Sequence, residues 1–299
     1  MIKREKRSDF IEQILSKCLS LLLQTNAKGQ TPLHVAARYG HSAIVKLLIK
    51  SCAKARDRDL EKLEMDQVTA VREMLRITDR ESNTALHVAA KYGDVEMVEG
   101  LLKLEDPDFL YSAYKIQETP HYIAARSGDA EATRIILQKE GNLTKERDED
   151  GYTPFHYAAH LGCISVVEEL LKWDVSAAYI GDTKRGMTPL LMAARQGNAG
   201  TISKILSLCP DCCEKVDNKG LNLLHYLAFR GTSSTLGPLL FRYGYIESLN
   251  VSVRNLMELE GDFGMTPQEV YNAFLSEKHH QDNVAGMAEA NCRIVERYC

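Results

Sequence analysis

The stretch Asp148-Glu149-Asp150-Gly151-Tyr152-Thr153-Pro154-Phe155-His156-Tyr157-Ala158-Ala159-His160-Leu161-Gly162 decides the fold of this chain. It opens with a turn, because a turn-initiating Asp148 is followed three positions later by Gly151. The pair Ala158-Ala159 is small enough to let a neighbouring helix approach closely. Gly162 fits the left-handed residue that ends a short helix. The stretch therefore predicts a turn, a short helix and a sharp stop.

The same pattern recurs along the chain, with starts at Thr31, Thr84, Thr119, Thr153, Thr188, Asn222 and Thr266. Most successive starts are 34 or 35 residues apart, and two longer intervals indicate insertions at about 51–75 and 241–258. A Gly stands nine positions after each of the first six starts. Later in each repeat, apolar residues such as Val167, Leu170 and Leu171 recur at spacings of three and four, which predicts a second helix with one buried stripe.

This period and the tetrapeptide Thr-Pro-Leu-His at 31–34 match the ankyrin repeat. We therefore expect an all-α ankyrin-repeat solenoid of stacked helix pairs with short β-hairpin fingers. One helix pair cannot bury its apolar face alone, so stacking produces a continuous core. Two fingers should be less regular, because Ser82 and Gln117 stand where the other fingers have Gly.

The ends and insertions complete the expected organisation: a basic arm at 1–9, the repeat domain at 10–275 and a polar tail at 276–299. The mixed charges of 51–75 predict an exposed helix or a long loop. Residues 10–23 are similar to the second helix of an upstream repeat. We expect the apolar face of this helix to be partly uncovered, and it is formed by Ile11, Ile14, Leu15 and Leu22.

Composition indicates a soluble, cytoplasmic protein. The chain has 299 residues, 26% of them charged, and a formal net charge of −4, so bulk charge favours neither nucleic acid nor membrane as a partner. No signal peptide and no stretch approaching about 18 apolar residues is present, so we expect no direct membrane insertion by this chain. Without a secretory context, the eight cysteines are expected to be reduced thiols.

Several residues could suggest chemistry, but a structural role explains each more simply. One histidine per repeat, as in His34 and His156, is spread along a solenoid too widely for joint metal ligation, and predicts hydrogen bonds to the backbone of the fingers. The Cys-x-x-Cys segment 209–212 has no second ligand pair. Trp173 is expected to be a packing residue. No catalytic motif appears, so we expect a non-enzymatic protein with no cofactor, no metal and no catalytic residue.

The segments Thr31–His41, Asp150–Ala159 and Cys209–Glu214, with the charged insertion 51–75, resemble plant ankyrin–transmembrane proteins of the accelerated-cell-death class. The resemblance implies a protein-interaction scaffold in plant immune or cell-death signal transduction. Members of that family carry a C-terminal membrane domain opened by a Pro-Gly-Gly motif, which this sequence lacks. The alternative is the cytosolic ankyrin domain of a multi-span membrane protein, on the cytosolic side of the plasma membrane, whose membrane domain is missing from this chain.

A partner is expected on the concave face of the solenoid, lined by fingers and first helices. The position seven residues after each start should project there, and basic and aromatic residues at this position favour an acidic peptide or protein. The alternative is that these side chains are simply solvated, and the sequence leaves self-association open. The candidate partner-binding residues are Arg38, Tyr39, Lys91, Tyr92, Arg126, Tyr152, His160, Arg195, Phe229 and Arg230.

Overall fold

The computed structural model describes residues 2–59, 67–106, 119–139, 141–230 and 255–273. These residues form helices and turns, and no strand is assigned among them. The chain divides into two compact units, Met1–Leu143 and Thr144–Cys299. The third finger with Gln117, most of the insertion at 241–258 and the tail at 276–299 lie outside the described residues.

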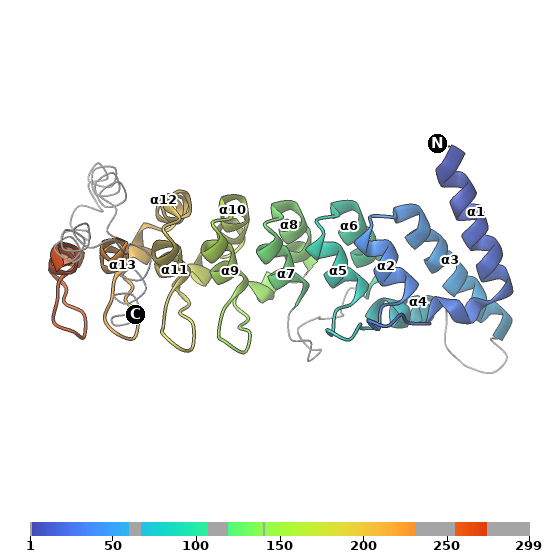
Figure 1. Ribbon diagram of the computed structural model, residues 1–299, viewed down its shortest axis with the longest axis horizontal. Helices are drawn as coiled ribbons and strands as arrows, with labels where there is room; N and C mark the ends of the chain where they lie inside the picture. Colours follow the sequence, from blue (N-terminus) through green and yellow to red (C-terminus); the bar gives the residue numbers. More distant parts are fainter. Residues whose placement is uncertain (1, 60–66, 107–118, 140, 231–254, 274–299) are drawn as a thin grey trace, which may run out of the picture. The chain divides into compact units, whose positions relative to one another are not determined.

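Unit 1 is a stack of short first helices backed by second helices. The first helices α2, α5 and α7 pack on one another in chain order, while α1 packs on α3 and α6 on α8 (Figure 1). The helices of unit 1 are α1 (Ile2–Lys17), α2 (Pro32–Arg38), α3 (Ser42–Asp59), α4 (Gln67–Arg76), α5 (Ala85–Lys91), α6 (Val95–Leu104), α7 (Pro120–Ser127) and α8 (Ala130–Lys139). A 3-10 turn, η1 (Leu19–Leu22), follows α1, and η3 (Gly141–Thr144) spans the boundary between the units.

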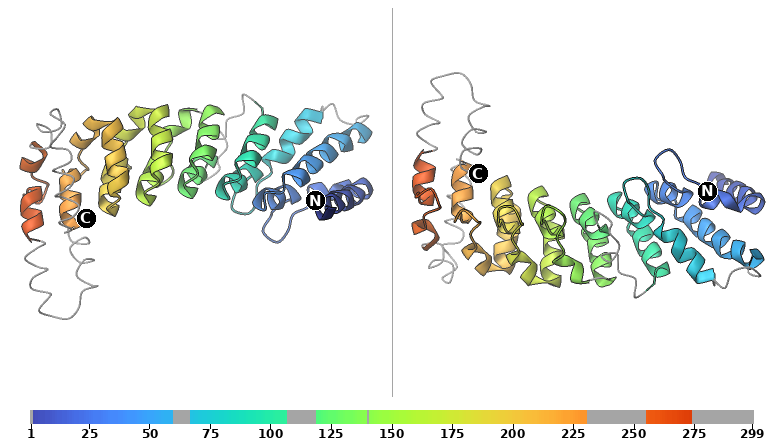
Figure 2. Two further views of the ribbon diagram at one scale, coloured as in Figure 1. Left: turned by 90° about the horizontal axis from the view of Figure 1, so that it is seen from above. Right: turned by 90° about the horizontal axis from the view of Figure 1, so that it is seen from below.

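Unit 2 repeats the same plan. The first helices α9, α11 and α13 form one row and the second helices α10 and α12 another (Figure 2). The helices of unit 2 are α9 (Pro154–Leu161), α10 (Ile164–Trp173), η4 (Val175–Tyr179), α11 (Pro189–Gln196), α12 (Ala199–Leu208), η5 (Pro210–Glu214) and α13 (Leu223–Phe229). Further helical residues lie at 255–258 and 267–273. The helix pairs expected from the 34-residue period are thus confirmed where the chain is described.

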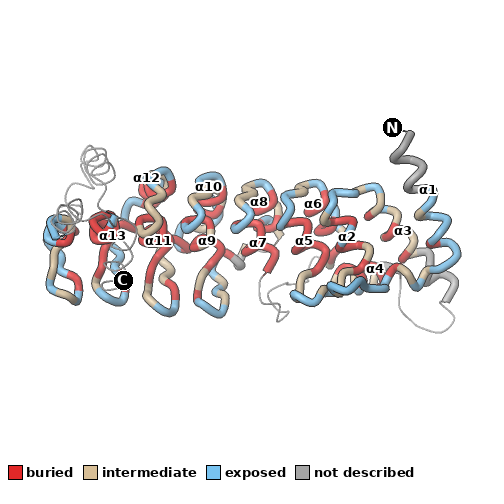
Figure 3. Tube along the Cα trace, viewed as in Figure 1, coloured by how far each residue is buried: buried red, intermediate tan, exposed pale blue. Residues whose placement is uncertain are grey.

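Local chemistry explains the short first helices. Thr153 caps α9 in extended conformation, Pro154 occupies the first turn, and Gly162 ends the helix at φ 76° in the left-handed region. The pair Ala158-Ala159 is fully buried. Because these side chains are so small, neighbouring first helices come close, and the buried residues form a continuous stripe through each unit (Figure 3).

The fingers are hairpin turns without assigned strands in the described part of the chain. In the fourth finger, the Asp148 carboxylate accepts the N–H groups of Asp150 and Tyr152 at 3.0 and 2.8 Å. The Asp148 N–H donates to the Tyr152 carbonyl at 3.0 Å and closes the turn. Neighbouring tips are joined directly, as where the Asn218 N–H donates to the Arg185 carbonyl at 2.7 Å. Single bonds of this kind position adjacent fingers without forming a ladder.

The first insertion is largely helical where it is described, but its last part is not exposed as expected. Its first part continues α3 to Asp59, and its last part is α4. Helix α4 packs on α3 and buries four apolar side chains, Ala70, Val71, Met74 and Leu75. This part of the insertion is therefore not exposed, contrary to the expectation from the sequence. The apolar stripe of α4 accounts for this burial.

The N-terminal helix occupies the place of a second helix, because α1 packs on α3 as α6 packs on α8. Residues 2–9, set apart above as a basic arm, belong to this helix. The predicted apolar face is only partly covered: Leu15 of α1 and Leu22 of η1 are buried and Ile11 is half-buried, whereas Ile14 is 36% exposed. The expected uncovered face is therefore restricted to one part of α1, where Phe10 is also exposed.

Candidate functional site

Unit 1 contains a groove between its first two fingers. The groove has a volume of about 490 Å³ and lies between the finger residues 27–30 and 79–83 and the ends of α2 and α5. Its lining includes four basic side chains: Lys28, Arg38, Arg80 and Lys91. It also includes two acidic side chains, Asp79 and Glu81. The lining is therefore net positive although the whole chain is negative.

The acidic residues of the groove accept hydrogen bonds from within their own finger. One oxygen of the Asp79 carboxylate accepts the backbone N–H groups of Glu81 and Asn83, each at 2.9 Å. The Glu81 carboxylate accepts a longer bond of 3.4 Å from the Asn83 side chain. None of the four basic side chains forms an ion pair with a described residue. Their charge thus remains available to a ligand.

Arg38 is held by two tyrosines. Its guanidinium carbon lies 5.8 Å from the centre of the Tyr39 ring and 5.4 Å from the centre of the Tyr92 ring, so it reaches the neighbouring repeat. Tyr39 and Tyr92 are 64% and 50% exposed. Contact with the rings restricts the guanidinium but consumes none of its N–H donors. Arg38 is thus preorganised to bind a carboxylate or phosphate.

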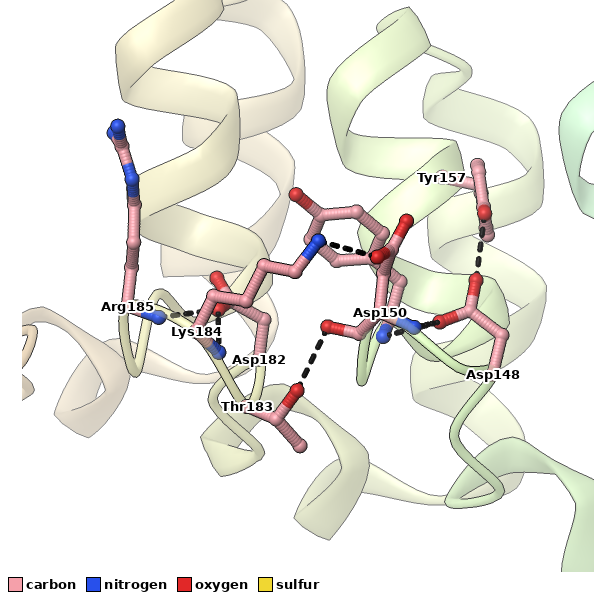
Figure 4. A network of polar contacts seen from close by, with 8 residues as sticks. Asp148, Asp150, Tyr157, Asp182, Thr183, Lys184 and Arg185 are labelled. Atoms are coloured by element: carbon pink, nitrogen blue, oxygen red, sulfur yellow. Dashed lines mark hydrogen bonds and ion pairs between the residues drawn. The ribbon is translucent and has the colours of Figure 1, made fainter.

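Several charged groups on the fingers of unit 2 are paired with groups on the same or a neighbouring finger (Figure 4). The ammonium of Lys184 pairs with the carboxylate of Asp150 on the preceding finger. The Thr183 hydroxyl donates to the Asp150 carbonyl at 2.9 Å. The Tyr157 hydroxyl donates to the Asp148 carboxylate at 2.6 Å. This network stabilises the stack of fingers, whereas the Arg185 guanidinium forms no ion pair with a described residue.

The structure brings together four of the sequence-predicted partner residues: Arg38, Tyr39, Lys91 and Tyr92. Others lie apart from this groove. Arg126 is exposed at the end of α7 in unit 1 but does not line it. In unit 2, His160 is exposed, Tyr152 is half-buried against the rings of His156 and Tyr157, and Arg230 donates to the Arg195 carbonyl at 3.2 Å.

Phe229 corrects the prediction that every residue at this position faces a partner. It is only 6% exposed, and its ring centre lies 6.3 Å from those of both Tyr226 and Phe263. An aromatic ring at this position gains more from packing on the next finger than from exposure to water. Arg230, the following residue, is exposed.

Sequence reasoning missed Lys28 and Arg80, which contribute half of the basic charge of the groove. The predicted partner residues stand mainly at one position of the first helix, whereas Lys28 and Arg80 stand on the fingers. The Arg80 N–H donates to the Lys28 carbonyl at 3.1 Å, so the two tips are adjacent. A basic residue beside the turn glycine, as in Lys28-Gly29, was the available signal.

Three of the repeat histidines connect neighbouring repeats through hydrogen bonds. The Thr153 N–H donates to Nδ1 of His156 at 3.0 Å, so this nitrogen carries no proton in the neutral ring. Nε2–H then donates to the Met187 carbonyl of the next finger at 2.8 Å. His34 and His225 repeat this arrangement with the carbonyls of Asn83 and Met265, as the sequence predicts. No group of three or more His, Cys, Asp or Glu side chains in the described ranges is arranged to hold a metal ion.

Two further expectations need correction. Cys209 and Cys212 form a disulfide, with their Cα atoms 5.7 Å apart, so these two are not the reduced thiols expected. Cys209 is the residue before η5 and Cys212 lies within it. In the preceding 3-10 turn, η4, the equivalent position is occupied by Asp174, whose carboxylate accepts the Ser176 N–H. Trp173 is 44% exposed and is not a buried packing residue, because it is the last residue of α10.

The repeats place this protein among known families. The model of three ankyrin repeats matches residues 4–111 and 86–179, and the chain belongs to the ankyrin repeat family, a typically non-catalytic interaction fold. The crystal structure of the ankyrin repeat domain of Bcl-3, a member of the IkappaB protein family, has the same fold, with a TM-score of 0.58 and 22% identity, covering 83% of this chain and 99% of that one.

Longer relatives contain a similar region. Protein ACCELERATED CELL DEATH 6 of Arabidopsis thaliana is 25% identical, across 62% of this chain and 34% of that protein. The human transient receptor potential cation channel subfamily A member 1 is 28% identical, across 64% of this chain and 18% of the channel. The chain therefore spans about a third or less of the length of these two relatives. None of the described helices combines the length and apolar character needed to cross a membrane.

Proposed function

We propose that this chain is a non-catalytic scaffold that binds a protein partner on the concave face of its repeats, with the groove of unit 1 as the main contact. The observation that carries the proposal is the set of four basic side chains without ion pairs to described residues. A cluster of basic side chains on an acidic chain attracts an acidic partner and increases its rate of encounter. Salt should weaken the attraction, because the Debye length at 0.15 M is roughly 8 Å.

The signalling context is a further part of the proposal. The likeness to Protein ACCELERATED CELL DEATH 6 supports a role in plant immune or cell-death signalling from the cytoplasm. The likeness to a cation channel, and the small share of each long relative that is matched, support the alternative of a cytosolic domain in a multi-span membrane protein. Full-length transcript sequencing separates the two: a reading frame with downstream apolar spans supports the alternative, and one without them supports the scaffold.

The binding proposal is tested with a displayed library of random peptides selected on the full chain. Wild type is compared with R38E/K91E in the groove and with K46E/K50E, two exposed lysines of α3 in the same unit. Both double variants change the net charge equally. Peptides that bind wild type and K46E/K50E but not R38E/K91E support the groove. Selected peptides that bind all three proteins alike would contradict it.

A further inference from the structure

Arg38 and Lys91 occupy matching positions in neighbouring repeats. Each is the last residue of its first helix, α2 or α5, and these helices pack directly on each other. Both side chains line the same groove. Packed helices lie about 8–10 Å apart, so the backbones of these two residues are separated by about that distance, and a peptide that offers one side chain to each repeat should match this repeat spacing.

In an extended peptide, only one sequence spacing between two side chains matches the distance between neighbouring repeats. In the polyproline II conformation the chain rises about 3.1 Å per residue with three residues per turn, so side chains three apart face the same way at about 9 Å. In a strand, side chains on one face are two residues and only about 6.6 Å apart. A peptide that runs from one repeat to the next should therefore contact the two repeats with its residues i and i+3.

We propose that the groove recognises an extended peptide segment with two acidic side chains three residues apart, one bound by Arg38 and the other by Lys91. The inference rests on the proposed function and specifies the partner. Charge complementarity supports it, because Lys28 and Arg80 add positive charge at the finger side while Asp79 is engaged in its own turn.

The two anchors are unequal. Arg38 presents a planar fork of donors held by Tyr39 and Tyr92, which suits bidentate binding of a carboxylate. Lys91 is exposed and supplies a compact charge without such restraint. Loss of Arg38 should therefore weaken binding more than loss of Lys91.

The test uses the full chain and fluorescein-labelled peptides of eleven residues built from Gly, Ser and Ala, read by fluorescence anisotropy. One peptide carries Glu at i and i+3, two others carry Glu at i, i+1 or at i, i+2, and a neutral one carries Gln at i and i+3. The proteins are wild type, R38Q, K91Q and K46Q, the last an exposed lysine outside the groove. Thermal melts verify folding, and K91Q gives an independent result if R38Q fails to fold.

The inference predicts that wild type binds the i, i+3 peptide about tenfold or more tightly than the others. R38Q should remove this preference, K91Q should reduce it, and K46Q should retain it. Equal binding of the three Glu peptides, or a preference that survives both R38Q and K91Q, would overturn the inference. Library peptides that depend on the groove but lack spaced acids would also overturn it while leaving the proposed function standing. Absence of any groove-dependent peptide would defeat the proposed function itself.

Discussion

At the scale of single residues, the finger turns show how backbone conformation selects side chains. The turn glycines, such as Gly151 and Gly220, have φ values of 82° and 70°, in the region that side chains with a Cβ rarely adopt. Ser82 occupies the same place in the second finger with φ 62°. The sequence predicts an irregular finger there, yet the turn is formed, because Asp79 accepts two backbone N–H groups that hold it.

Replacing Ser82 by glycine should therefore stabilise the protein. Relief of the left-handed strain is worth roughly 1–2 kcal/mol, and the extra freedom of glycine in the unfolded chain offsets roughly 0.5–1 kcal/mol. We expect S82G to raise the free energy of unfolding by about 0.5–1 kcal/mol in urea titrations. The control is G220S, where a Cβ meets nothing closer than 3.5 Å and the cost is that of the backbone alone. Stabilisation by G220S, or destabilisation by S82G, would refute this explanation.

At the scale of elements, α4 is attached by more than its apolar stripe. The Arg76 guanidinium donates to the Glu105 carboxylate at 2.7 Å, at the C-terminal end of α6. The Glu105 side chain is fully buried, whereas Arg76 is 26% exposed. A buried carboxylate deprived of its partner is costly, whereas an exposed pair contributes little.

R76A should accordingly destabilise unit 1 by about 3 kcal/mol, since it leaves the Glu105 charge buried and without this partner. K103A is the matched control: Lys103 pairs with Glu99 on α6, and both side chains are at least half exposed. We expect K103A to change the free energy of unfolding by less than about 0.5 kcal/mol. Chemical denaturation of both variants provides the measurement. Equal effects would show that the buried pair is not what anchors α4.

The same element marks the limit of sequence reasoning. The period, the alanine pairs and the terminal glycines predict the stacked helix pairs because each acts within one repeat. The burial of α4 was not predicted, because the charged residues at 54–62 indicated exposure for the whole insertion, including the apolar stripe that follows them. Two of the four basic side chains of the groove were not predicted, for a different reason. Lys28 and Arg80 meet only because two fingers far apart in sequence are hydrogen-bonded at their tips.

At the scale of the whole molecule, repeat histidines make stability depend on pH. Burial lowers the pKa of His156 to about 4, and it lowers the pKa of His34 and of His225 as well. The unfolded chain takes up protons near pH 6.5 while the folded rings remain neutral. Stability conferred by the neutral rings is therefore complete above pH 6.5 and is lost as the pH falls below it.

We expect the free energy of unfolding to fall between pH 6.5 and pH 5 by up to about 1.4 kcal/mol per pH unit for each such histidine. Urea titrations at pH 7.5, 6.0 and 5.0 measure the slope. H156Q should reduce the slope, because glutamine does not titrate. A stability that rises on acidification through this range would contradict the proposed hydrogen-bond arrangement.

The central claim is that the basic groove of unit 1 is the partner site. The most direct measurement is the affinity of one library-selected peptide for wild type, R38E/K91E and K46E/K50E, each at 50 and 300 mM NaCl. We predict that R38E/K91E loses binding at least thirtyfold, that K46E/K50E stays within about threefold of wild type, and that salt weakens wild-type binding. Retained affinity in R38E/K91E, with loss in K46E/K50E, would contradict the claim and place the partner on α3 instead.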